Sequence, residues 1–339
     1  MAALSRAAVI GAGAWGTTIG SLLATKVDTT IWAREPEVVD AINCRHENPL
    51  YLRGGALSPA LRAAASLEAA ADGAEVVFVA VPAQHFRSVL SSAAGSVNPR
   101  SIVLSLAKGL EHGTLLRMSQ VAAEVLPEHD RGRIGVLSGP NIAREVHAGQ
   151  PTATVIALAD GAACGAVQAM VSTDRMRVYA NPDVAGCEVG GVVKNVIAIA
   201  AGMATGLGFG QNTLAALLTR GLAELTRLGV ALGGNPLTFM GLAGIGDLSV
   251  TCHSADSRNH HVGVELGRGR SLDDILGEVR SVAEGVRSCE PLLALADRVA
   301  VELPICTQVG AVLAGRTSVE RAVDDLLGRE AGFELHGIA

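Results

Sequence analysis

Two lysines in this sequence lie where proton transfer could be useful. Of the twenty-seven basic residues only three are Lys, and the rest are Arg, which stays charged at any ordinary pH. Lys108 directly follows a predicted strand, and Lys194 and Asn195 are the only strongly polar residues between positions 189 and 201. A helix that is apolar on all sides is buried, and burial lowers the pKa of a Lys. We therefore predict that Lys194 exchanges a proton with a carbonyl or alcohol oxygen. The alternative is that its ammonium group reaches the surface, as we predict for the third lysine, Lys26.

A single carboxylate, Asp247, lies in the apolar, glycine-rich stretch 244–248. It could hold the ammonium group of Lys194 or bind substrate hydroxyls, because a carboxylate in apolar surroundings needs a partner. Its other interpretation is a helix cap. All three roles stay open on the sequence alone.

Three polar residues, Ser257, Arg258 and Asn259, precede a predicted helix. Together they present a hydroxyl, a guanidinium and an amide at a helix N-terminus, which is a suitable site for an anion and above all for a phosphate. His260 and His261 follow directly, but no third ligand is spaced for a metal. We predict no metal site here and interpret both histidines as surface residues.

The start of the chain carries a dinucleotide-binding pattern. The predicted strand Ala7–Ile10 runs into Gly11, Ala12, Gly13, Ala14, Trp15 and Gly16, and a predicted helix follows. This is G-x-G-x-x-G between a strand and a helix, the context in which the glycines allow a tight turn and close approach of a pyrophosphate. The N–H groups of the helix N-terminus would bind its oxygens.

The end of the second predicted strand indicates which cofactor is preferred. Sites selective for NAD place Asp or Glu there, whereas this chain has Arg34, which can pair with a 2′-phosphate. NADPH is therefore favoured, with NADH as the other candidate. The adjacent Glu35 precedes Pro36, and we interpret it as serving the start of a helix. The alternative for Arg34 is a solvated surface charge.

Regular alternation of strands and helices in the first half predicts a mostly parallel sheet of the Rossmann type. The predicted strands are Ala7–Ile10, Thr29–Trp32, Val76–Val81, Ile102–Leu106, Ile134–Leu137 and Thr154–Leu158. The predicted helices between them are Thr17–Ala24, Pro36–Asn43, Phe86–Ala94, Leu115–Leu126 and Ala162–Val171.

From about Pro182 the strand signal stops, and the second half is predicted to be all-α. A leucine stripe at helical spacing runs from Leu214 to Leu228. Ser271 with Asp274, and Thr317 with Glu320, have capping-box spacing. We predict a dinucleotide-binding domain over residues 1–181 and a helical catalytic domain over residues 182–339.

Composition excludes several other classes of protein. The net charge of −6 disfavours a nucleic-acid partner, which usually meets a basic face. The longest weakly polar run, 196–209, contains glycines and is shorter than the roughly 20 apolar residues of a membrane span. The six Cys are widely spaced, which fits small buried side chains in a reducing cytoplasm rather than a disulfide framework.

A hydride carrier, a proton-transferring lysine and a phosphate site together indicate reduction of a phosphorylated ketone or the reverse. At this point the sequence resembles the bacterial-type NAD(P)-dependent glycerol-3-phosphate dehydrogenases. The resemblance covers roughly residues 7–328. It lies in the blocks 11–16, 107–110, 138–140, 190–199, 241–248, 257–259 and 282–285. It implies reduction of dihydroxyacetone phosphate to sn-glycerol 3-phosphate, a phospholipid precursor, by a cytoplasmic homodimer.

The resemblance also implies roles for individual residues. Lys194 would be the proton donor and acceptor, and Lys108 would contact both cofactor and substrate. Residues expected at the substrate are Gly139, Asn141, Asn195, Asp247, Ser257, Arg258 and Asn259. Residues expected at the cofactor are the Gly11–Gly16 loop with Ala14 and Trp15, together with Arg34, Ala143, Arg258, Val282 and Glu284.

This chain departs from the family pattern at three positions. Asn141 replaces a Ser or Thr, although its amide can still bond the substrate, while Ile142 replaces Phe and Ala14 a frequent Ser. Two other functions stay open. A 3-hydroxyacid dehydrogenase also combines a Rossmann domain with a helix-borne Lys, but has no need of a phosphate site at Arg258. A non-catalytic NADPH sensor would not need both lysines and Asp247.

Overall fold

The computed structural model describes residues 3–278 and 283–330, and the chain forms two compact units. Unit 1 comprises Met1–Ala107 and Leu116–Val184, and unit 2 comprises Lys108–Leu115 and Ala185–Ala339. The predicted division after residue 181 did not anticipate that the short segment carrying Lys108 belongs to unit 2. A prediction that divides the chain at a single position cannot assign a short internal segment to the other unit.

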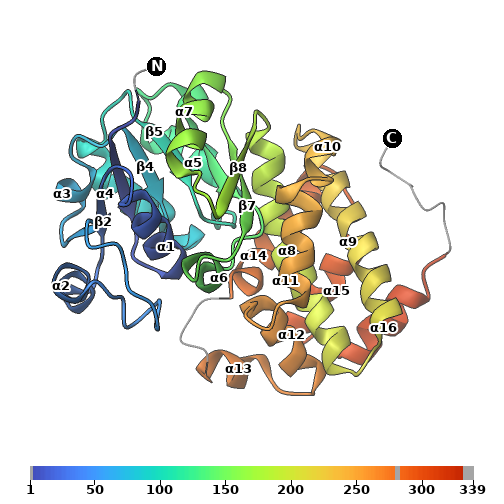
Figure 1. Cartoon of the computed structure of the whole chain (residues 1–339). Coiled ribbons are helices and arrows are strands. Elements are labelled where there is room, and N and C mark those ends of the chain that lie inside the picture. The colour runs from blue at the N-terminus through green and yellow to red at the C-terminus, as the bar shows by residue number, and fades with distance from the viewer. Residues whose placement is uncertain (1–2, 279–282, 331–339) are drawn as a thin grey trace. The chain divides into compact units, whose positions relative to one another are not determined.

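Unit 1 is built on one sheet with the strand order β3-β2-β1-β4-β5-β6-β7-β8. Figure 1 draws this sheet with helices packed around it. Its strands are β1 (Arg6–Ile10), β2 (Asp28–Trp32), β3 (Arg62–Ala64), β4 (Val76–Val79), β5 (Ile102–Ser105), β6 (Ile134–Ser138), β7 (Thr152–Ala157) and β8 (Met176–Asn181). Every neighbouring pair is parallel except β6 and β7. The predicted mostly parallel sheet is therefore confirmed.

Two strands were not predicted, and both have weak sequence signals. β3 is three residues long and has the sequence Arg-Ala-Ala, without the β-branched or aromatic residues that strands favour. β8 alternates buried and exposed residues at the edge of the sheet, with Arg177 stacked 5.3 Å from the ring centre of Tyr179. The strand signal thus extends to Asn181, beyond the last predicted strand.

Helices cover both faces of this sheet, because successive buried side chains of β4 belong alternately to two hydrophobic clusters. Val76 and Phe78 pack into one hydrophobic cluster, and Val77 and Val79 into another. The helices of unit 1 are α1 (Ala14–Leu23), α2 (Pro36–Arg45), α3 (Leu67–Ala71), α4 (Ala83–Ala93), α5 (Met118–Val125), α6 (Ala143–His147) and α7 (Gly161–Val171). The first cluster contains side chains of α1 and α7, and the second contains those of α4 and α5. The five-residue helices α3 and α6 are too short for a periodic signal and were not predicted.

The sequence suggested that Lys26 is simply solvated, but its ammonium group is hydrogen-bonded to the protein. Its ammonium group donates to the backbone oxygens of Ala169 (3.1 Å), Met170 (3.4 Å) and Ser172, where α7 ends. A cation at a helix C-terminus satisfies carbonyls that have no partner within the helix. This lysine therefore has a structural role.

Unit 2 is helical in the described part of the chain, as predicted. Its helices are α8 (Val184–Gly206), α9 (Gln211–Ala231), α10 (Pro236–Phe239), the π-helical turn η3 (Leu242–Gly246), α11 (Asp247–His253), α12 (Arg258–Gly267), α13 (Leu272–Glu278), α14 (Glu284–Arg298), α15 (Pro304–Leu313) and α16 (Val319–Leu327). In α9 the leucine stripe is confirmed at its buried members Leu214, Leu225 and Leu228.

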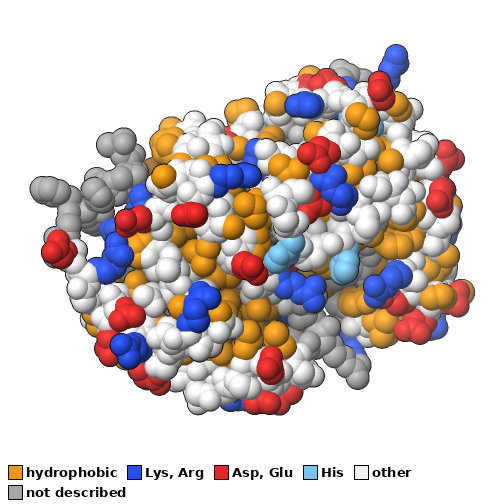
Figure 2. All heavy atoms as spheres, turned by 180° about the vertical axis from the view of Figure 1, so that it is seen from behind, with side chains coloured by type: hydrophobic (Ala, Val, Ile, Leu, Met, Phe, Trp, Pro, Cys, Tyr) orange, Lys and Arg blue, Asp and Glu red, His pale blue; other side chains and the backbone are white. Residues whose placement is uncertain are grey.

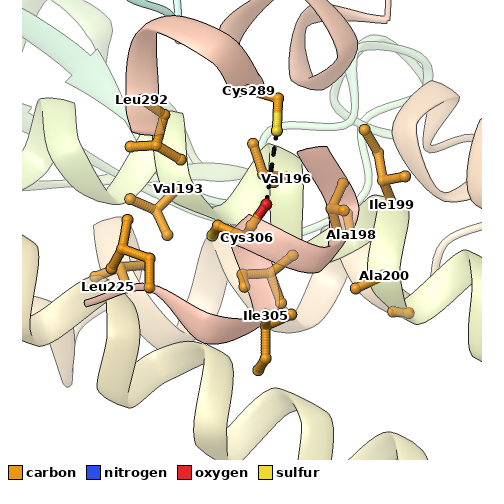
Figure 3. Packing of buried hydrophobic residues seen from close by; sticks show 14 of the residues in the cluster. Val193, Val196, Ala198, Ile199, Ala200, Leu225, Cys289, Leu292, Ile305 and Cys306 are labelled. Atoms are coloured by element: carbon orange, nitrogen blue, oxygen red, sulfur yellow. Dashed lines mark hydrogen bonds between the residues drawn. The ribbon is translucent and has the colours of Figure 1, made fainter. Parts of the chain in front are cut away.

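The long helix α8 forms the centre of the unit 2 core. Val193 and Val196 pack with Leu225 of α9, Leu292 of α14 and Ile305 of α15 (Figure 3). By length and composition α8 could cross a membrane, contrary to our estimate from the apolar run. However, 89% of its most apolar window is buried inside the protein, which is how the core helix of a globular unit passes the same test.

The caps of two helices and the burial of the cysteines were also predicted from the sequence. Ser271 accepts a hydrogen bond from the backbone N–H of Asp274, as its spacing predicted. The cap of α16 is Ser318 rather than Thr317, with Ser318 accepting from the N–H of Arg321. The six cysteines are free, but Cys44 is exposed and so differs from the predicted set of buried side chains.

Candidate functional site

The glycine-rich loop of unit 1 is held in a shape that only glycine can adopt at two positions. Gly11 has a φ of +116°, and a Cβ there would lie 2.7 Å from the backbone oxygen of Ala80. A Cβ on Gly16 would lie 2.0 Å from the oxygen of Gly11. Both contacts are far inside normal van der Waals distance, so the turn between β1 and α1 closes tightly only without side chains.

Space is open at the third glycine, where a cofactor would approach. A Cβ on Gly13 would meet no atom of the described residues within 4 Å, and Gly13 is the N-cap of α1 without a side-chain bond to the helix. The N–H groups of Ala14 and Trp15 point out of the first turn, where they have no partner within the helix. The indole Nε1 of Trp15 is buried and has no hydrogen-bond partner in the part of the chain that the structure describes. These features fit the pyrophosphate of a dinucleotide.

A buried asparagine that the sequence did not reveal supports this loop. Asn48 is fully buried, and its Nδ2 donates to the backbone oxygen of Ala12 and to Oγ1 of Thr17, both at 2.8 Å. Thr17 in turn donates to the same Ala12 oxygen at 3.1 Å. Because Asn48 lies thirty-six residues from Ala12, no short motif could connect them.

Arg34, Glu35 and Tyr51 form a hydrogen-bonded group at the end of β2. Arg34 donates from Nε (3.1 Å) and Nη2 (2.7 Å) to Oε1 of Glu35, and the Tyr51 hydroxyl donates to the same oxygen at 3.0 Å. Burial alone would raise the pKa of Glu35, but Arg34 and Tyr51 outweigh it and lower that pKa. Our interpretation of Glu35 was wrong in part: it is the N-cap residue of α2, but its side chain makes no capping bond.

The loop between β6 and α6 contains the other candidate residues of unit 1. Gly139 has a φ of +118°, which favours glycine at this sharp turn. Both amide atoms of Asn141 are buried and have no hydrogen-bond partner among the described residues. Ala143 begins α6, and its backbone oxygen accepts from Oγ1 of Thr18 on α1 at 3.3 Å. The unsatisfied amide of Asn141 is the part of this loop best suited to bind a ligand.

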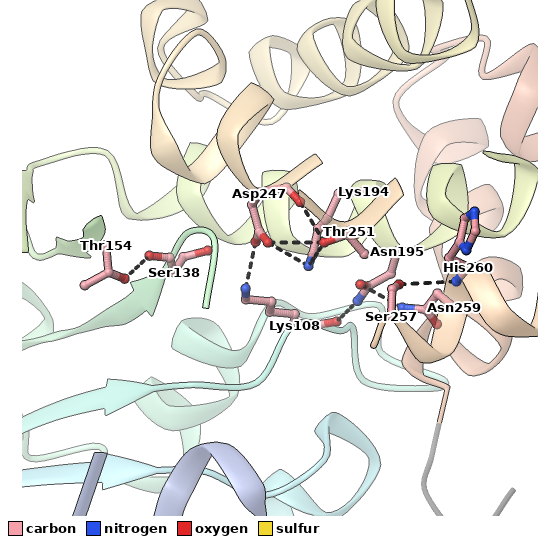
Figure 4. Close-up of polar contacts among 10 residues, drawn as sticks. All are labelled: Lys108, Ser138, Thr154, Lys194, Asn195, Asp247, Thr251, Ser257, Asn259 and His260. Atoms are coloured by element: carbon pink, nitrogen blue, oxygen red, sulfur yellow. Dashed lines mark hydrogen bonds and ion pairs between the residues drawn. The ribbon is translucent and has the colours of Figure 1, made fainter. Parts of the chain in front are cut away.

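In unit 2, two ammonium groups share one buried carboxylate (Figure 4). Lys194 Nζ lies 2.7 Å from Oδ1 of Asp247, and Lys108 Nζ lies 2.7 Å from Oδ2. Lys194 also donates to Oγ1 of Thr251 at 2.6 Å. The side chains of Asp247 and Lys194 are only 1% and 8% exposed, so solvent contributes little to their stabilisation. Of the roles left open for Asp247, the structure shows the one that holds Lys194, and Lys194 does not reach the surface.

The charges in this cluster shift each other's protonation. Burial lowers the pKa of Lys194 from 10.5 to about 8; Asp247 opposes this shift, and Lys108 adds to it by repulsion. Burial by itself would raise the pKa of Asp247, but the two lysines outweigh it and keep that pKa below its ordinary value. Lys194 can therefore lose or gain a proton near neutral pH while Asp247 stays ionised.

Two glycines of α8 allow these groups to come so close. A Cβ on Gly190 would lie 2.2 Å from the oxygen of Ala243, and one on Gly191 would lie 3.1 Å from Cγ of Lys108. Without side chains there, η3 and the Lys108 segment can pack directly against the helix that carries Lys194. Helix α11 begins at Asp247, directly after η3, and thereby brings the carboxylate to the two lysines.

The asparagines next to the cluster bond to the protein and to each other. Asn195 donates to the backbone oxygen of Lys108 at 3.1 Å and accepts from Nδ2 of Asn259 at 2.9 Å. Oδ1 of Asn259 accepts from the N–H of Gly285 at 2.9 Å. This chain of bonds links the Lys108 segment, α8, α12 and the first turn of α14.

The predicted phosphate residues lie at the N-terminus of α12. Ser257 caps the helix by accepting from the N–H of His260 at 3.2 Å, and Arg258 is exposed in the first turn. His260 is half-buried with Nε2 3.3 Å from Oγ1 of Thr205, so it is not the surface residue we predicted. Glu284, at the start of α14, lies close enough to Lys194 to raise its pKa slightly against burial. Val282 lies outside the described residues.

Comparisons with known proteins assign the chain to a family. It matches the N-terminal region of NAD-dependent glycerol-3-phosphate dehydrogenase over residues 6–164 and the C-terminal region over residues 183–324. The chain belongs to the NAD-dependent glycerol-3-phosphate dehydrogenase family. The resemblance stated from the sequence is thereby confirmed, and the chain is an NAD(P)-linked oxidoreductase rather than a non-catalytic sensor.

Several relatives match over nearly their whole length. A glycerol-3-phosphate dehydrogenase (NAD(P)+) of Parafrankia sp. is 52% identical, covering 98% of this chain and 99% of that protein. The corresponding protein of Rhodospirillum rubrum is 51% identical, covering 96% and 93%. The crystal structure of glycerol-3-phosphate dehydrogenase from Coxiella burnetii has a TM-score of 0.91 at 34% identity, covering 96% of this chain and 99% of that one.

Two further observations concern the charged and metal-ligating side chains of the described residues. Within residues 3–278 and 283–330, no group of three His, Cys, Asp or Glu side chains could hold a metal ion. On the face drawn in Figure 2, acidic and basic side chains are scattered among hydrophobic ones.

Proposed function

We propose that this chain reduces dihydroxyacetone phosphate to sn-glycerol 3-phosphate, reversibly, with NADPH as the preferred hydride donor. The observation that carries this proposal is the buried cluster of Lys194, Asp247 and Lys108. Within this cluster the pKa of Lys194 is about 8, which suits Lys194 to proton transfer. Family membership supports the reaction class. The proposed product would supply glycerophospholipid synthesis.

The two units have separate roles in this proposal. Unit 1, whose loop fits a pyrophosphate, is the dinucleotide-binding domain, and unit 2 is the helical substrate domain. In unit 1 we assign the Gly11–Gly16 loop with Ala14 and Trp15, as well as Arg34 and Ala143, to the cofactor. In unit 2, Lys108, Arg258 and Glu284 complete the cofactor contacts.

When bound, the nicotinamide supplies the hydride that adds to the ketone carbon. Lys194 donates its proton to the oxygen that becomes the alcohol, and Lys108 stabilises the negative charge that develops there. Asp247 is the third catalytic residue, because it holds both ammonium groups in place and keeps Lys194 charged below pH about 8. In the reverse direction, neutral Lys194 accepts the proton of the alcohol.

The phosphate of the substrate would be bound away from the reacting carbon. Arg258 supplies a charged donor at the N-terminus of α12, and Ser257 and Asn259 supply polar groups beside it. Binding energy from such a remote group positions the ketone. We assign Gly139 and Asn141 of unit 1 and Asn195 of unit 2 to the remaining substrate contacts; the unsatisfied amide of Asn141 supports its assignment.

Arg34 supports a preference for NADPH, because its exposed guanidinium can pair with a 2′-phosphate. NADH remains the second donor, as the NAD(P)+ in the names of the relatives suggests for those proteins. We further propose a cytoplasmic homodimer. The strongly exposed apolar side chains of Leu237 and Met240 in unit 2 are consistent with a partner surface.

The first test is oxidation of NADPH and of NADH by the purified protein with dihydroxyacetone phosphate. Unphosphorylated dihydroxyacetone and a phosphate-free hydroxyacid pair are the controls. Rapid turnover only with the phosphorylated ketone, and faster with NADPH, would support the reaction, the Arg258 site and the Arg34 assignment. Turnover of a 3-hydroxyacid instead would transfer the proposal to that reaction class.

A further inference from the structure

The hydrogen-bonded group at the end of β2 combines two demands that a cofactor site usually separates. A carboxylate at this position bonds the ribose hydroxyls of NAD, whereas an Arg accommodates the 2′-phosphate of NADP. Here Arg34 and Glu35 are adjacent and bonded to each other at 2.7 Å. Their side chains are 75% and 22% exposed, so both remain accessible to a ligand.

The three side-chain bonds from Arg34 and Tyr51 use only one of the two carboxylate oxygens of Glu35. Both bonds from Arg34 and the bond from Tyr51 end on Oε1 of Glu35. Oε2 takes part in none of these three bonds. A ribose hydroxyl could donate to Oε2 while Arg34 stays in place, whereas a 2′-phosphate would compete with Glu35 for the guanidinium and be repelled by its charge.

Tyr51 is held by the same loop that supports the glycine-rich turn. Its backbone N–H donates to Oδ1 of Asn48 at 3.1 Å, and Asn48 donates to the oxygen of Ala12. Tyr51 is thereby held next to the glycine-rich loop. Its hydroxyl in turn holds the carboxylate of Glu35 in place. Position, partner and loop all belong to unit 1.

We propose that Glu35, positioned by Tyr51, determines cofactor selectivity: it offsets the preference of Arg34 for a 2′-phosphate and lets the site accept NADH as well as NADPH. The proposal refines the cofactor choice within the proposed function. Glu35 would touch the ribose, and Tyr51 is a positioning residue.

The test compares two ligands that differ only in the 2′-phosphate, ADP-ribose and 2′-phospho-ADP-ribose, by titration calorimetry of the full chain. Glu35→Gln removes the charge and keeps the shape. We expect tighter binding of the phosphorylated ligand and weaker binding of the other, so that the ratio of dissociation constants changes about tenfold. The matched control is Glu37→Gln, which removes the same charge from the exposed first turn of the same helix.

A change below about twofold, an equal change in the Glu37 control, or a shift toward ADP-ribose would overturn the proposal. Tyr51→Phe gives a second readout. We expect it to weaken ADP-ribose about twofold and leave 2′-phospho-ADP-ribose nearly unchanged, because only the ribose bond needs a fixed carboxylate. Equal weakening of both ligands would indicate a merely structural role. Both titrations are independent of turnover, so a failure of the proposed reaction would be seen separately.

Discussion

Two acid–base pairs with the same separation have opposite characters in this molecule. Lys194 and Asp247 in unit 2, and Arg34 and Glu35 in unit 1, each lie 2.7 Å apart. The first pair is almost completely buried, whereas the guanidinium of the second is three-quarters exposed. Distance therefore does not decide what such a pair can do; the surrounding dielectric does.

Burial turns the first pair into a proton-transfer device. Because water is excluded, the charged form of Lys194 is costly and its pKa falls to about 8, while Asp247 remains ionised between two cations. Exposure makes the second pair exchangeable, since water and salt can replace either partner at little cost. The buried pair suits catalysis and the exposed pair suits ligand selection.

Removing the proton carrier should have the largest effect. Lys194→Met should lower kcat by about 100- to 10,000-fold, the range for loss of a general acid, while NADPH binding stays nearly intact. Stopped-flow oxidation of NADPH and fluorescence titration of the cofactor measure the two quantities. Lys26→Met is the control, because it removes an ammonium group at an exposed site in unit 1. Retention of more than about a tenth of the wild-type rate would refute the role of Lys194.

Removing the carboxylate tests whether the buried charges depend on each other. Asp247→Asn leaves two ammonium groups without their counter-ion, so we expect a loss of about 3–5 kcal/mol in the free energy of unfolding. The pKa of Lys194 should fall further, because the attraction that opposes its lowering is lost. Urea denaturation measures the stability. The exposed Asp273→Asn should change it by less than about 0.5 kcal/mol, and equal losses in both variants would contradict the comparison.

The dependence of activity on pH follows from the pKa of Lys194. Reduction needs the protonated form, so kcat/KM for the ketone should be constant below pH about 8 and fall about tenfold per unit above it. Oxidation of the alcohol needs neutral Lys194, so kcat/KM for the alcohol should rise as the pH approaches about 8. Steady-state rates in both directions from pH about 6 to about 10 would show it. Profiles with the same slope in both directions would contradict proton transfer by Lys194.

The sequence predicted the fold where local signals are strong. Buried strands such as β4 and β5 and the glycine-rich turn carry continuous apolar runs and a spaced motif, and all were found near their predicted bounds. β3 and β8 were missed because one is short and poor in strand formers and the other lies at the edge of the sheet. Helix α8 was recognised as buried because it lacks a polar face.

The site was predictable in its charged members but not in their supports. Lys194 stood out because lysine is rare in this chain and apolar residues surround it. Thr251, Asn48 and Tyr51 did not stand out, because each acts through a partner brought near by the fold. Glu35 was misread because its nearest sequence feature, a helix start, competes with a side-chain partner that only the structure shows.

Raising the salt concentration should affect the exposed ion pair more than the buried one. This is the smallest of the expected effects but the most specific. Raising KCl from about 0.1 to about 1 M shortens the Debye length from about 10 to about 3 Å, which screens exposed charges far more than buried ones. We expect the dissociation constant of ADP-ribose divided by that of 2′-phospho-ADP-ribose to fall about threefold, because this ratio depends on the charges of the exposed Arg34 and Glu35. Salt weakens pyrophosphate binding in both ligands alike, so the ratio cancels that contribution. The pH midpoint of kcat/KM, set by the buried Lys194, should move by less than about 0.3 unit in the same range. A midpoint that moves as much as the selectivity does would mean that water and ions reach Lys194 as freely as Arg34, and the contrast between the two pairs would then be lost.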